Sequence, residues 1–554
     1  MLKRNGVHIL FVLVICFFAF FVHNRAVHVD IMESRNLVTA KEMVQYNNWL
    51  VPTMNGELRL EKPPLPTWIA AAIEACFPDR LGLQRAAGGV MATMMVFFLY
   101  FLTIALTRER LLGLLSALVL ATSFSVVMMG RVVTWDIYCH SFMLGAIFFL
   151  YRAMSAKRTR WWDFAMAGIF MGLSFLGKGP VSFYALLLPF LITYIAMYRP
   201  SFRHKWWPMV MAVAICCVLS FWWPLYLYFT HPGGALGALA KESTAWMERN
   251  VRPWYYYWQF FTESGIWSLA LLTVLCGWYW LRKRMLFSKE YTLAVAWTLL
   301  TLVLLSLFPE KKIRYLLPLL IPASMAVGHY FFYLFSEIKS NRLSVKGKVL
   351  FRINAFFPAL VALGVPVALY LLFYAKQEMS LWLYVVISIL FLITALSITE
   401  GGIKLKPLKV FTGMMVLMIL VETLLMPSLA NQFNNPDKKS IRAIRDIEAL
   451  HAYPFYYPEG EELRIELIYE AGRRILPCNL ADTVLLEKLP MVLVSASPAE
   501  EVLPSMLLER VDMYLVDMYD NNNWPKSSRR YSGNFLRYVT VIHKRPQMIS
   551  DYNL

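Results

Sequence analysis

The sequence predicts a polytopic α-helical membrane protein of about 13 transmembrane helices, followed by a small C-terminal α/β domain. Apolar residues make up 58% of the 554 residues and charged residues only 16%, whereas soluble proteins have about 45–50% and about 25%. The apolar residues are also gathered into runs long enough to cross a bilayer. This composition excludes a large soluble enzyme, a disordered chain and a coiled coil.

The expected membrane spans follow from the apolar runs, because a spanning helix needs about 20 mainly apolar residues. The first run follows Lys3 and Arg4 and has no small-residue cleavage signal after it, so we expect a retained span rather than a signal peptide. The predicted spans are residues 8–22, 87–106, 111–129, 137–154, 162–177, 181–198, 207–228, 265–281, 291–308, 314–335, 351–374, 381–398 and 409–426. An odd number of spans puts the two ends of the chain on opposite sides.

The basic residues predict the orientation. The formal net charge is +18, which in a soluble protein would suggest nucleic-acid binding. Membrane proteins instead concentrate Lys and Arg in cytoplasmic connections, so we expect no nucleic-acid partner. The basic residues gather in alternate connections, starting at Lys3 and Arg4, and this predicts a cytoplasmic N-terminus and an external C-terminus. The long segments 23–86 and 229–264 then face outward.

The domain organisation follows from a change of pattern near residue 428. We expect a transmembrane domain over 1–427, which includes the outer loop 23–86, and an external α/β domain over 428–554. In the second domain the runs LRIELIYE, PMVLVSAS, VDMYLVDMY and RYVTVIHK alternate as strands do, and KSIRAIRDIEAL is typical of a helix. It contains no nucleotide-binding loop, which favours a role as a lid or scaffold.

Four outward segments carry basic residues next to Gly and Pro at the membrane boundary, where positive charge is normally depleted. They are RLEKPPLPTW (59–68), LGKGPVSF (176–183), MERNVRPWYYYW (247–258) and FPEKKIRYLLP (308–318). The alternative is ordinary decoration of helix ends by snorkelling side chains. A phosphate-bearing substrate explains four such motifs on one face, since Lys and Arg are its usual partners. The candidate substrate-binding residues are Arg35, Glu61, Lys62, Arg131, Lys178, Arg249, Arg252, Lys311, Lys312, Arg314 and Tyr315.

Carboxylates accompany these cations on the same face. The run DIMESR places Asp30 and Glu33 just after the first span, and MGRVVTWDIY places Asp136 in a short hinge. We take these three as candidate catalytic residues, which could act as a base or as metal ligands. An Asp at a helix start is also often an N-cap. No metal-ligand spacing such as HExxH occurs, so no cofactor is required, although a divalent ion on Glu33 or Asp136 is compatible with the sequence.

The run over residues 32–68 resembles the first outer loop of the lipid A aminoarabinose transferases and of the wider protein mannosyltransferase-like group. These are membrane glycosyltransferases of the GT-C architecture, which use polyprenyl-phosphate sugars as donors. The likeness continues through RVVTWD (131–136), GKGP (177–180), ERNVRPWYYY (248–257) and KKIRYLLP (311–318). It implies a GT-C-like fold in a bacterial inner membrane, with the C-terminal domain in the periplasm.

The resemblance also implies roles for single residues. The first outer loop of such enzymes carries D-E-x-R, but this chain has Met32-Glu33-Ser34-Arg35, so the family Asp is missing. Either Glu33 or Asp30 takes that role, or a strong base is not needed.

Further matches concern the phosphate of the donor. Lys62 and Arg249 match positions that hold the lipid phosphate, and Asp136 matches the second acidic position. Lys178 and the basic residues 311–314 match further cationic positions.

The implied reaction is transfer of a sugar from a polyprenyl phosphate to an acceptor, with inversion at the anomeric carbon. The missing Asp favours a lipid A phosphate as acceptor, since a phosphate is already ionised near neutral pH. Three alternatives stay open. They are a transferase with a protein or glycan hydroxyl as acceptor, a transporter or flippase of lipid-linked sugars, and a receptor that binds a partner through its tail.

Overall fold

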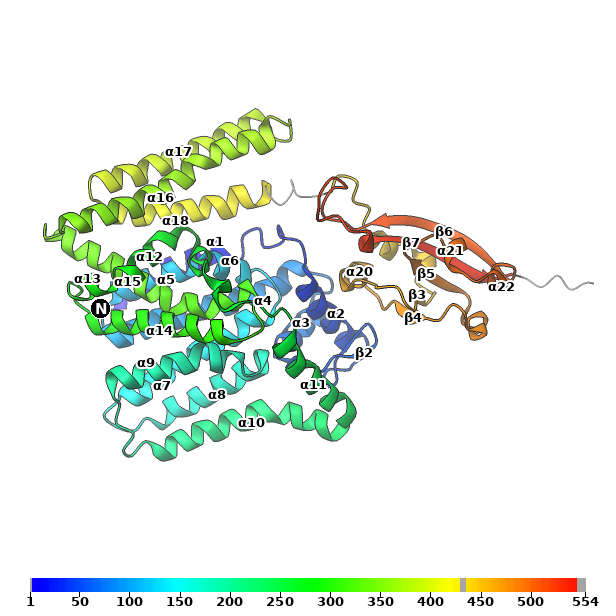
Figure 1. The fold of residues 1–554 in the computed structure, drawn as a ribbon, viewed down its shortest axis with the longest axis horizontal. Coiled ribbons are helices and arrows are strands. Elements are labelled where there is room, and N and C mark those ends of the chain that lie inside the picture. The colour runs from blue at the N-terminus through cyan, green and yellow to red at the C-terminus, as the bar shows by residue number, and fades with distance from the viewer. Residues whose placement is uncertain (1, 429–434, 546–554) are drawn as a thin grey trace, which may run out of the picture. The chain divides into compact units, whose positions relative to one another are not determined.

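The chain divides into two units in a computed structural model that describes residues 2–428 and 435–545. The first unit comprises Met1–Val27 and Leu60–Ser428 and is helical. The second comprises His28–Arg59 and Leu429–Leu554 and contains the β-strands. Figure 1 shows the long helices of the first unit packed side by side.

The first unit is built from α-helices. They are α1 (Leu2–Phe20), α3 (Leu65–Cys76), α4 (Leu81–Thr107), α5 (Arg110–Ala121), α6 (Phe124–Gly130), α7 (Trp135–Ser155), α8 (Trp161–Lys178), α9 (Leu188–Tyr198), α10 (Trp206–Thr230), α11 (Pro232–Glu248), α12 (Ser268–Cys276), α13 (Trp278–Arg282), α14 (Ser288–Leu307), α15 (Leu317–Lys339), α16 (Val345–Leu369), α17 (Leu381–Ile403) and α18 (Pro407–Leu420). Segments of 3₁₀ helix at Trp254–Tyr257, Phe260–Trp267 and Ile313–Leu316 precede α12 and α15. Turns of π-helix occur at Phe183–Leu187, Tyr370–Tyr374 and Val421–Leu425.

The predicted class of polytopic helical membrane protein is confirmed. Within residues 2–428 and 435–545, nine helices are long and apolar enough to cross a membrane, and the pair α5 and α6 makes a tenth if it counts as one span. The predicted spans 8–22, 162–177 and 181–198 fall on helical segments that do not meet this criterion.

The predicted span 111–129 is not one straight helix. It breaks into α5 and α6, which are bent by 67°. At the break, the Thr122 hydroxyl donates to the Leu118 carbonyl at 2.7 Å and the Ser123 hydroxyl to the Val119 carbonyl at 2.8 Å. Ser and Thr that bond back to the preceding turn compete with the helical hydrogen bonds and bend a helix.

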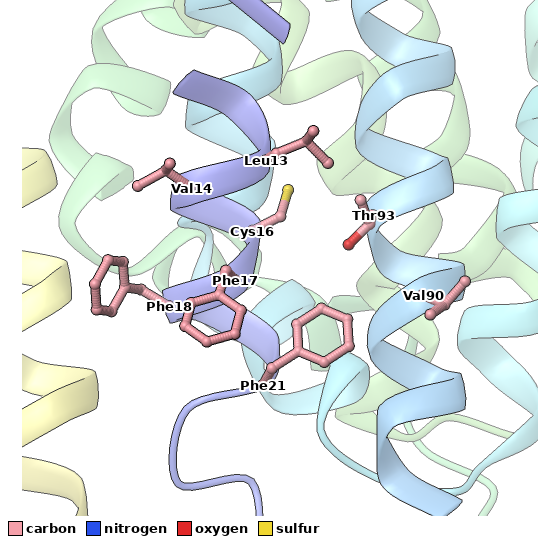
Figure 2. A pocket seen from close by; sticks show the side chains of 8 residues that line it. All are labelled: Leu13, Val14, Cys16, Phe17, Phe18, Phe21, Val90 and Thr93. Carbon is pink, nitrogen blue, oxygen red and sulfur yellow. The ribbon is translucent and has the colours of Figure 1, made fainter. Parts of the chain in front are cut away.

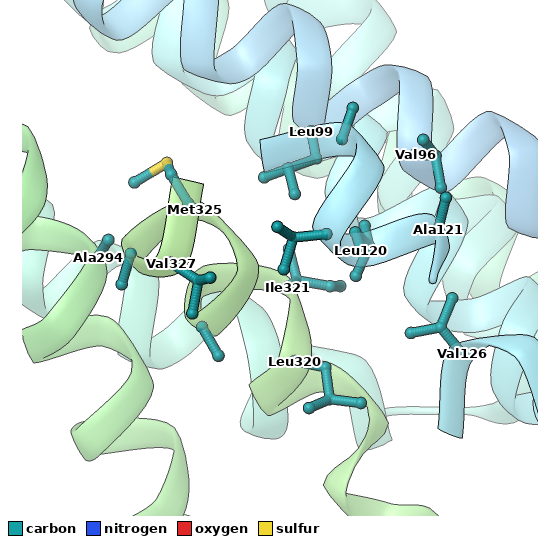
Figure 3. Close-up of a cluster of buried hydrophobic side chains, with 14 of the residues drawn as sticks. Val96, Leu99, Leu120, Ala121, Val126, Ala294, Leu320, Ile321, Met325 and Val327 are labelled. Atoms are coloured by element: carbon teal, nitrogen blue, oxygen red, sulfur yellow. The ribbon is translucent and has the colours of Figure 1, made fainter. Parts of the chain in front are cut away.

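The core of the first unit surrounds α15, and 89% of the most apolar 18-residue stretch within Ile313–Lys339 is buried. Figure 3 shows Leu320 and Ile321 of α15 among Leu99 of α4, Leu120 of α5 and Val126 of α6. The helices α5 and α15 approach closely at Gly328, where an added Cβ would lie 2.9 Å from the Cα of Ser116. The candidate site residues Lys311, Lys312, Arg314 and Tyr315 lie in the segment directly before this central helix.

An apolar hollow of about 540 Å³ lies between α1 and α4. Figure 2 shows Phe17 of α1 and Phe21, which follows α1, on one side of it and Val90 and Thr93 of α4 on the other. The Thr93 hydroxyl donates to the Gly89 carbonyl at 2.8 Å, so the polar atom on this wall is already satisfied. Such a surface suits contact with lipid chains.

The second unit is an α/β structure around a five-stranded sheet of order β4-β3-β5-β7-β6. Its elements are α2 (Ile31–Gln45), β1 (Thr53–Met54), β2 (Glu57–Leu58), β3 (Phe455–Pro458), α20 (Ile465–Ala471), β4 (Leu476–Cys478), β5 (Met491–Ser495), α21 (Ala499–Val502), α22 (Ser505–Leu508), β6 (Val511–Asp520) and β7 (Leu536–Lys544), with 3₁₀ turns at Ile441–Asp446, Glu448–Leu450, Thr483–Lys488 and Gly533–Phe535. The strand β3 runs parallel to β4 and β5, whereas β7 is antiparallel to β5 and β6.

Three of the four predicted strands are confirmed as β5, β6 and β7, and one is wrong. The run LRIELIYE forms the helix α20, because Ile465, Ile468 and Ala471 share a buried helical face and Gly472 ends the helix with φ +73°. The predicted helix over residues 439–450 consists of two short 3₁₀ turns. The helix α2 belongs to this unit, with Val38 packed in the same core as Ile441.

Candidate functional site

The ends of two neighbouring helices form the first part of the candidate site. Asp136 lies in the first turn of α7, and Lys178 lies in the last turn of α8. The Lys178 ammonium donates to the Asp136 carboxylate, and the two side chains are only 8% and 3% exposed. Lys178 Nζ also lies 4.9 Å from the ring centroid of Tyr315, which is within range of a cation–π interaction.

The second part of the site is centred on Glu310, which lies in the connection before α15. Its buried carboxylate accepts from Lys312 Nζ at 2.6 Å, from Arg249 Nε at 3.2 Å and from the Tyr315 hydroxyl at 3.1 Å. Burial alone would raise the pKa of Glu310, but the ion pairs with Lys312 and Arg249 outweigh it and hold the pKa below its usual value. A β-bridge between Val251 and Glu310 fixes the two segments to each other.

Lys311 has a different role from its neighbour. Its side chain is 4% exposed and donates to the carbonyls of Arg252 at 3.0 Å and Phe308 at 2.5 Å. Burial lowers the pKa of this ammonium. Lys311 therefore connects the two backbone segments, and Arg252 takes part through its carbonyl group.

A double ion pair forms the third part, between the segment before α3 and the helix α11. Lys62 Nζ lies 2.8 Å from both carboxylate oxygens of Glu242, and one residue earlier Lys241 Nζ lies 2.5 Å from Glu61. Burial lowers the pKa of Lys62, and the nearby charges of Lys178 and Arg249 lower it further, against the effect of Glu242. The Lys62 ammonium is therefore within electrostatic range of both other parts of the site.

These parts combine into one cationic cluster in the first unit. Arg314 belongs to it, since its charge acts on both Asp136 and Lys312. The cationic cluster consists of the five cations Lys62, Lys178, Arg249, Lys312 and Arg314 and the three carboxylates Asp136, Glu242 and Glu310. It carries a net positive charge, which suits a phosphate. Six of the predicted residues thus lie together, namely the five cations and Asp136. Tyr315 contacts Glu310 and Lys178 of this cluster, and Glu61 pairs with Lys241 next to it.

Arg131 lies in a separate buried group. Its side chain is fully buried, and its Nε donates to the Ala19 carbonyl of α1 at 2.7 Å. It forms an ion pair with Glu422 at 2.5 Å, and the charge of Arg85 is also near. In these contacts Arg131 links the ends of three helical segments.

The predicted residues Asp30, Glu33 and Arg35 belong to the second unit. Asp30 caps α2, because its Oδ1 accepts from the Glu33 amide at 2.7 Å. Glu33 is fully buried, and it lies near Tyr469 of α20. Burial, together with the charges of Glu470 and Glu33, raises the pKa of Tyr469 to about 12.

Sequence reasoning missed Glu242 and Glu310 as partners of the cations. Glu310 stands inside the motif FPEKKIRYLLP, directly before two lysines. The sequence signal for Glu242 is weaker. The dipeptide Glu61-Lys62 has its acidic residue first, whereas Lys241-Glu242 has its basic residue first, so the two dipeptides can form two ion pairs side by side. In the part of the chain that the structure describes, no group of three or more His, Cys, Asp or Glu residues is arranged to hold a metal ion.

The chain is similar in sequence and in fold to known membrane transferases. The model of the dolichyl-phosphate-mannose-protein mannosyltransferase family matches residues 61–223. The crystal structure of ArnT from Cupriavidus metallidurans bound to undecaprenyl phosphate is similar over 98% of this chain and 99% of that chain, with a TM-score of 0.65 and 16% identity. The chain has the ArnT fold. This confirms the expected resemblance to the aminoarabinose transferases and a fold of the GT-C class.

Two relatives found by sequence are named as arabinosyl transferases. An undecaprenyl phosphate-alpha-4-amino-4-deoxy-L-arabinose arabinosyl transferase of Pseudomonas fluorescens is 26% identical over 53% of this chain and 52% of its own length. One from Pseudomonas savastanoi is 25% identical over 68% of this chain and 69% of its own. The chain thus spans between about half and about two thirds of the length of these relatives.

Proposed function

We propose that the chain is an integral-membrane inverting glycosyltransferase that moves a sugar from a polyprenyl-phosphate donor to a lipid A phosphate. The cationic cluster carries this proposal, because five cations gathered beside helix ends are suited to a phosphate group. The similarity to transferases named for undecaprenyl phosphate and aminoarabinose supports the same donor class and favours aminoarabinose as the sugar.

In the proposed reaction the bond between the anomeric carbon and the donor phosphate breaks as the acceptor oxygen attacks from the opposite side. Negative charge then grows on the leaving phosphate. Lys62 and Arg249, with Arg314 and Lys178 nearby, stabilise this charge from positions that are already fixed by ion pairs. Such preorganised groups can lower the barrier by several kcal/mol.

The pairing of the carboxylates favours an ionised acceptor. Asp136 is held by Lys178, Glu242 by Lys62, and Glu310 by Lys312 and Arg249. A carboxylate held by a cation is a weak base, and the pKa of Glu310 is lowered accordingly. A hydroxyl acceptor needs a base to remove its proton, whereas a phosphate acceptor does not.

The location and domain roles belong to the same proposal. We place the chain in a bacterial inner membrane, with a cytoplasmic N-terminus and with the cationic cluster on the periplasmic side. A transmembrane transferase domain at 1–427 and a periplasmic domain at 428–554 remain proposals. A role for Asp30, Glu33 and Arg35, which belong to the second unit, in catalysis or substrate binding is likewise a proposal.

The proposal can be tested with the full-length protein in proteoliposomes. Purified protein is supplied with aminoarabinosyl undecaprenyl phosphate and lipid A, and the products are identified by mass spectrometry. We expect lipid A that carries aminoarabinose on a phosphate, with inverted configuration at the anomeric carbon. Movement of the donor between leaflets without any transfer product would instead identify a flippase. Transfer to a glycan or protein hydroxyl alone would overturn the assigned acceptor.

A further inference from the structure

A second cavity lies at the opposite end of α15 from the cationic cluster. Its volume is about 410 Å³. One wall is a face of α15 with the helical spacing of three and four residues, made by His329, Phe332, Tyr333, Ser336 and Glu337. At a rise of about 1.5 Å per residue, the α15 residues that line this cavity lie roughly 18–30 Å along the helix from Leu317, its first residue, which follows the candidate active site.

The other walls of the cavity are basic and apolar. Lys283 and Arg284 come from the connection between α13 and α14, and Arg342 comes from the connection between α15 and α16. Among the described residues that line the cavity, Glu337 is the single carboxylate, and it lies 3.7 Å from Arg342. Three cations face this one carboxylate, so positive charge is in excess. Arg284 is held in place by its bond to the Trp280 carbonyl at 3.2 Å and by the Trp280 ring, 4.5 Å away.

His329 lines the cavity and has a buried ring nitrogen without a hydrogen-bond partner in the described part of the chain. The side chain is 3% exposed, and its Nδ1 lies 2.8 Å from the Met325 carbonyl oxygen. A carbonyl oxygen can only accept, so Nδ1 carries the proton and Nε2 is an acceptor. Nε2 has no hydrogen-bond partner within the described part of the chain. Leaving such an acceptor buried and unpaired costs about 1–3 kcal/mol.

We propose that this cavity binds the headgroup of an anionic glycerophospholipid that carries a free hydroxyl, such as phosphatidylglycerol. The phosphate lies among Lys283, Arg284 and Arg342, and a headgroup hydroxyl donates to His329 Nε2. Phe332 and the exposed Leu286 contact the start of the acyl chains. In the proposed orientation the cavity opens to the cytoplasmic leaflet, where basic pockets between helices meet anionic headgroups. The site does not depend on transferase activity.

The lipid assignment is tested by thermal unfolding and by native mass spectrometry of the full-length protein in nanodiscs. We expect phosphatidylglycerol to raise the melting temperature relative to phosphatidylcholine. Phosphatidylethanol, a phosphodiester of equal charge without the hydroxyls, should bind about five-fold more weakly. Soluble glycerol 3-phosphate in phosphatidylcholine nanodiscs should have no comparable effect; an equal effect would assign the site to a soluble ester and overturn the lipid assignment.

Variants distinguish this site from unspecific attraction to anionic lipid. Arg284→Ala and Arg342→Ala should each lower phosphatidylglycerol affinity about five-fold. Lys346→Ala should not, because this exposed cation in the first turn of α16 lies outside the cavity. His329→Phe should abolish the preference for phosphatidylglycerol over phosphatidylethanol. If all three cation variants weaken binding equally, or if His329→Phe keeps the preference, the proposal is wrong. The Arg342 side chain is 68% exposed, so its variant is expected to fold.

Discussion

The ion pair between Lys62 and Glu242 leads to a prediction in which two substitutions act in opposite directions. The Lys62 ammonium can bind a phosphate only if its ion pair with Glu242 is weakened or broken, so Glu242 competes with the donor phosphate for Lys62. At 2.8 Å and an effective dielectric constant of about 20, the Coulomb attraction is about 6 kcal/mol. Both side chains are about one-fifth exposed, so desolvation and screening reduce its net value to about 1 kcal/mol.

Glu242→Gln should therefore raise the affinity for undecaprenyl phosphate about five-fold. Lys62→Met should lower it about 10- to 100-fold, since a hydrogen bond to a charged group contributes about 1.5–3 kcal/mol. Affinity is measured by titrating the full-length protein in nanodiscs with the carrier lipid and following tryptophan fluorescence. The matched control is Lys241→Met, which breaks the parallel pair with Glu61 without removing a cation of the cluster. If both Lys62 and Glu242 variants weaken binding, the pair is a structural link and the reasoning fails.

Three further predictions concern charge and stability. Lys178→Met should destabilise the protein by about 3–5 kcal/mol, since it leaves Asp136 buried without a partner. Adding Asp136→Asn should recover most of this loss, as measured by thermal unfolding. If the two substitutions instead lower the stability additively, the prediction is wrong. The pKa of Lys62 is lowered from the ordinary lysine value of 10.5, so the affinity for the carrier lipid should fall with rising pH at a midpoint below 10.5. Lys62→Arg should move that midpoint upward. An unchanged pH profile in this variant would exclude Lys62 as the titrating group. Arg474→Met should loosen α2, because Arg474 holds the buried Glu42 at 2.7 Å, and faster hydrogen exchange in α2 checks this against unchanged exchange in α17.

The membrane fold could be predicted because a long apolar run is a strong local signal. The bend between α5 and α6 could not, since it depends on Thr122 and Ser123 bonding back to the preceding turn, and the same residues occur in straight helices. The run around Ile468 fits both an alternating strand and a helical face, and tertiary packing decided for the helix.

The cations of the candidate site could be predicted from the sequence, but the carboxylates with which they form ion pairs could not. Basic residues at a membrane boundary stand out against the expected charge distribution, so Lys62, Lys178 and Lys312 were found from sequence alone. Which carboxylate each one meets depends on contacts between segments far apart in the chain, such as the 180 residues between Lys62 and Glu242. Lys311 looks like its neighbour in sequence, yet it bonds to backbone carbonyls because its side chain faces the interior.

The second unit is assembled from two stretches of chain, and the 369 residues of Leu60–Ser428 lie between them in the sequence. Its core includes Val38 of α2, and Asn55 exchanges hydrogen bonds of 2.7 and 2.9 Å with the backbone of Ile475. A truncation after residue 428 would therefore strip α2 of its packing partners as well as removing the tail. Loss of activity in such a deletion would say nothing about the tail alone, and expression of the isolated tail would need the missing stretch supplied as a separate peptide or a fused insert.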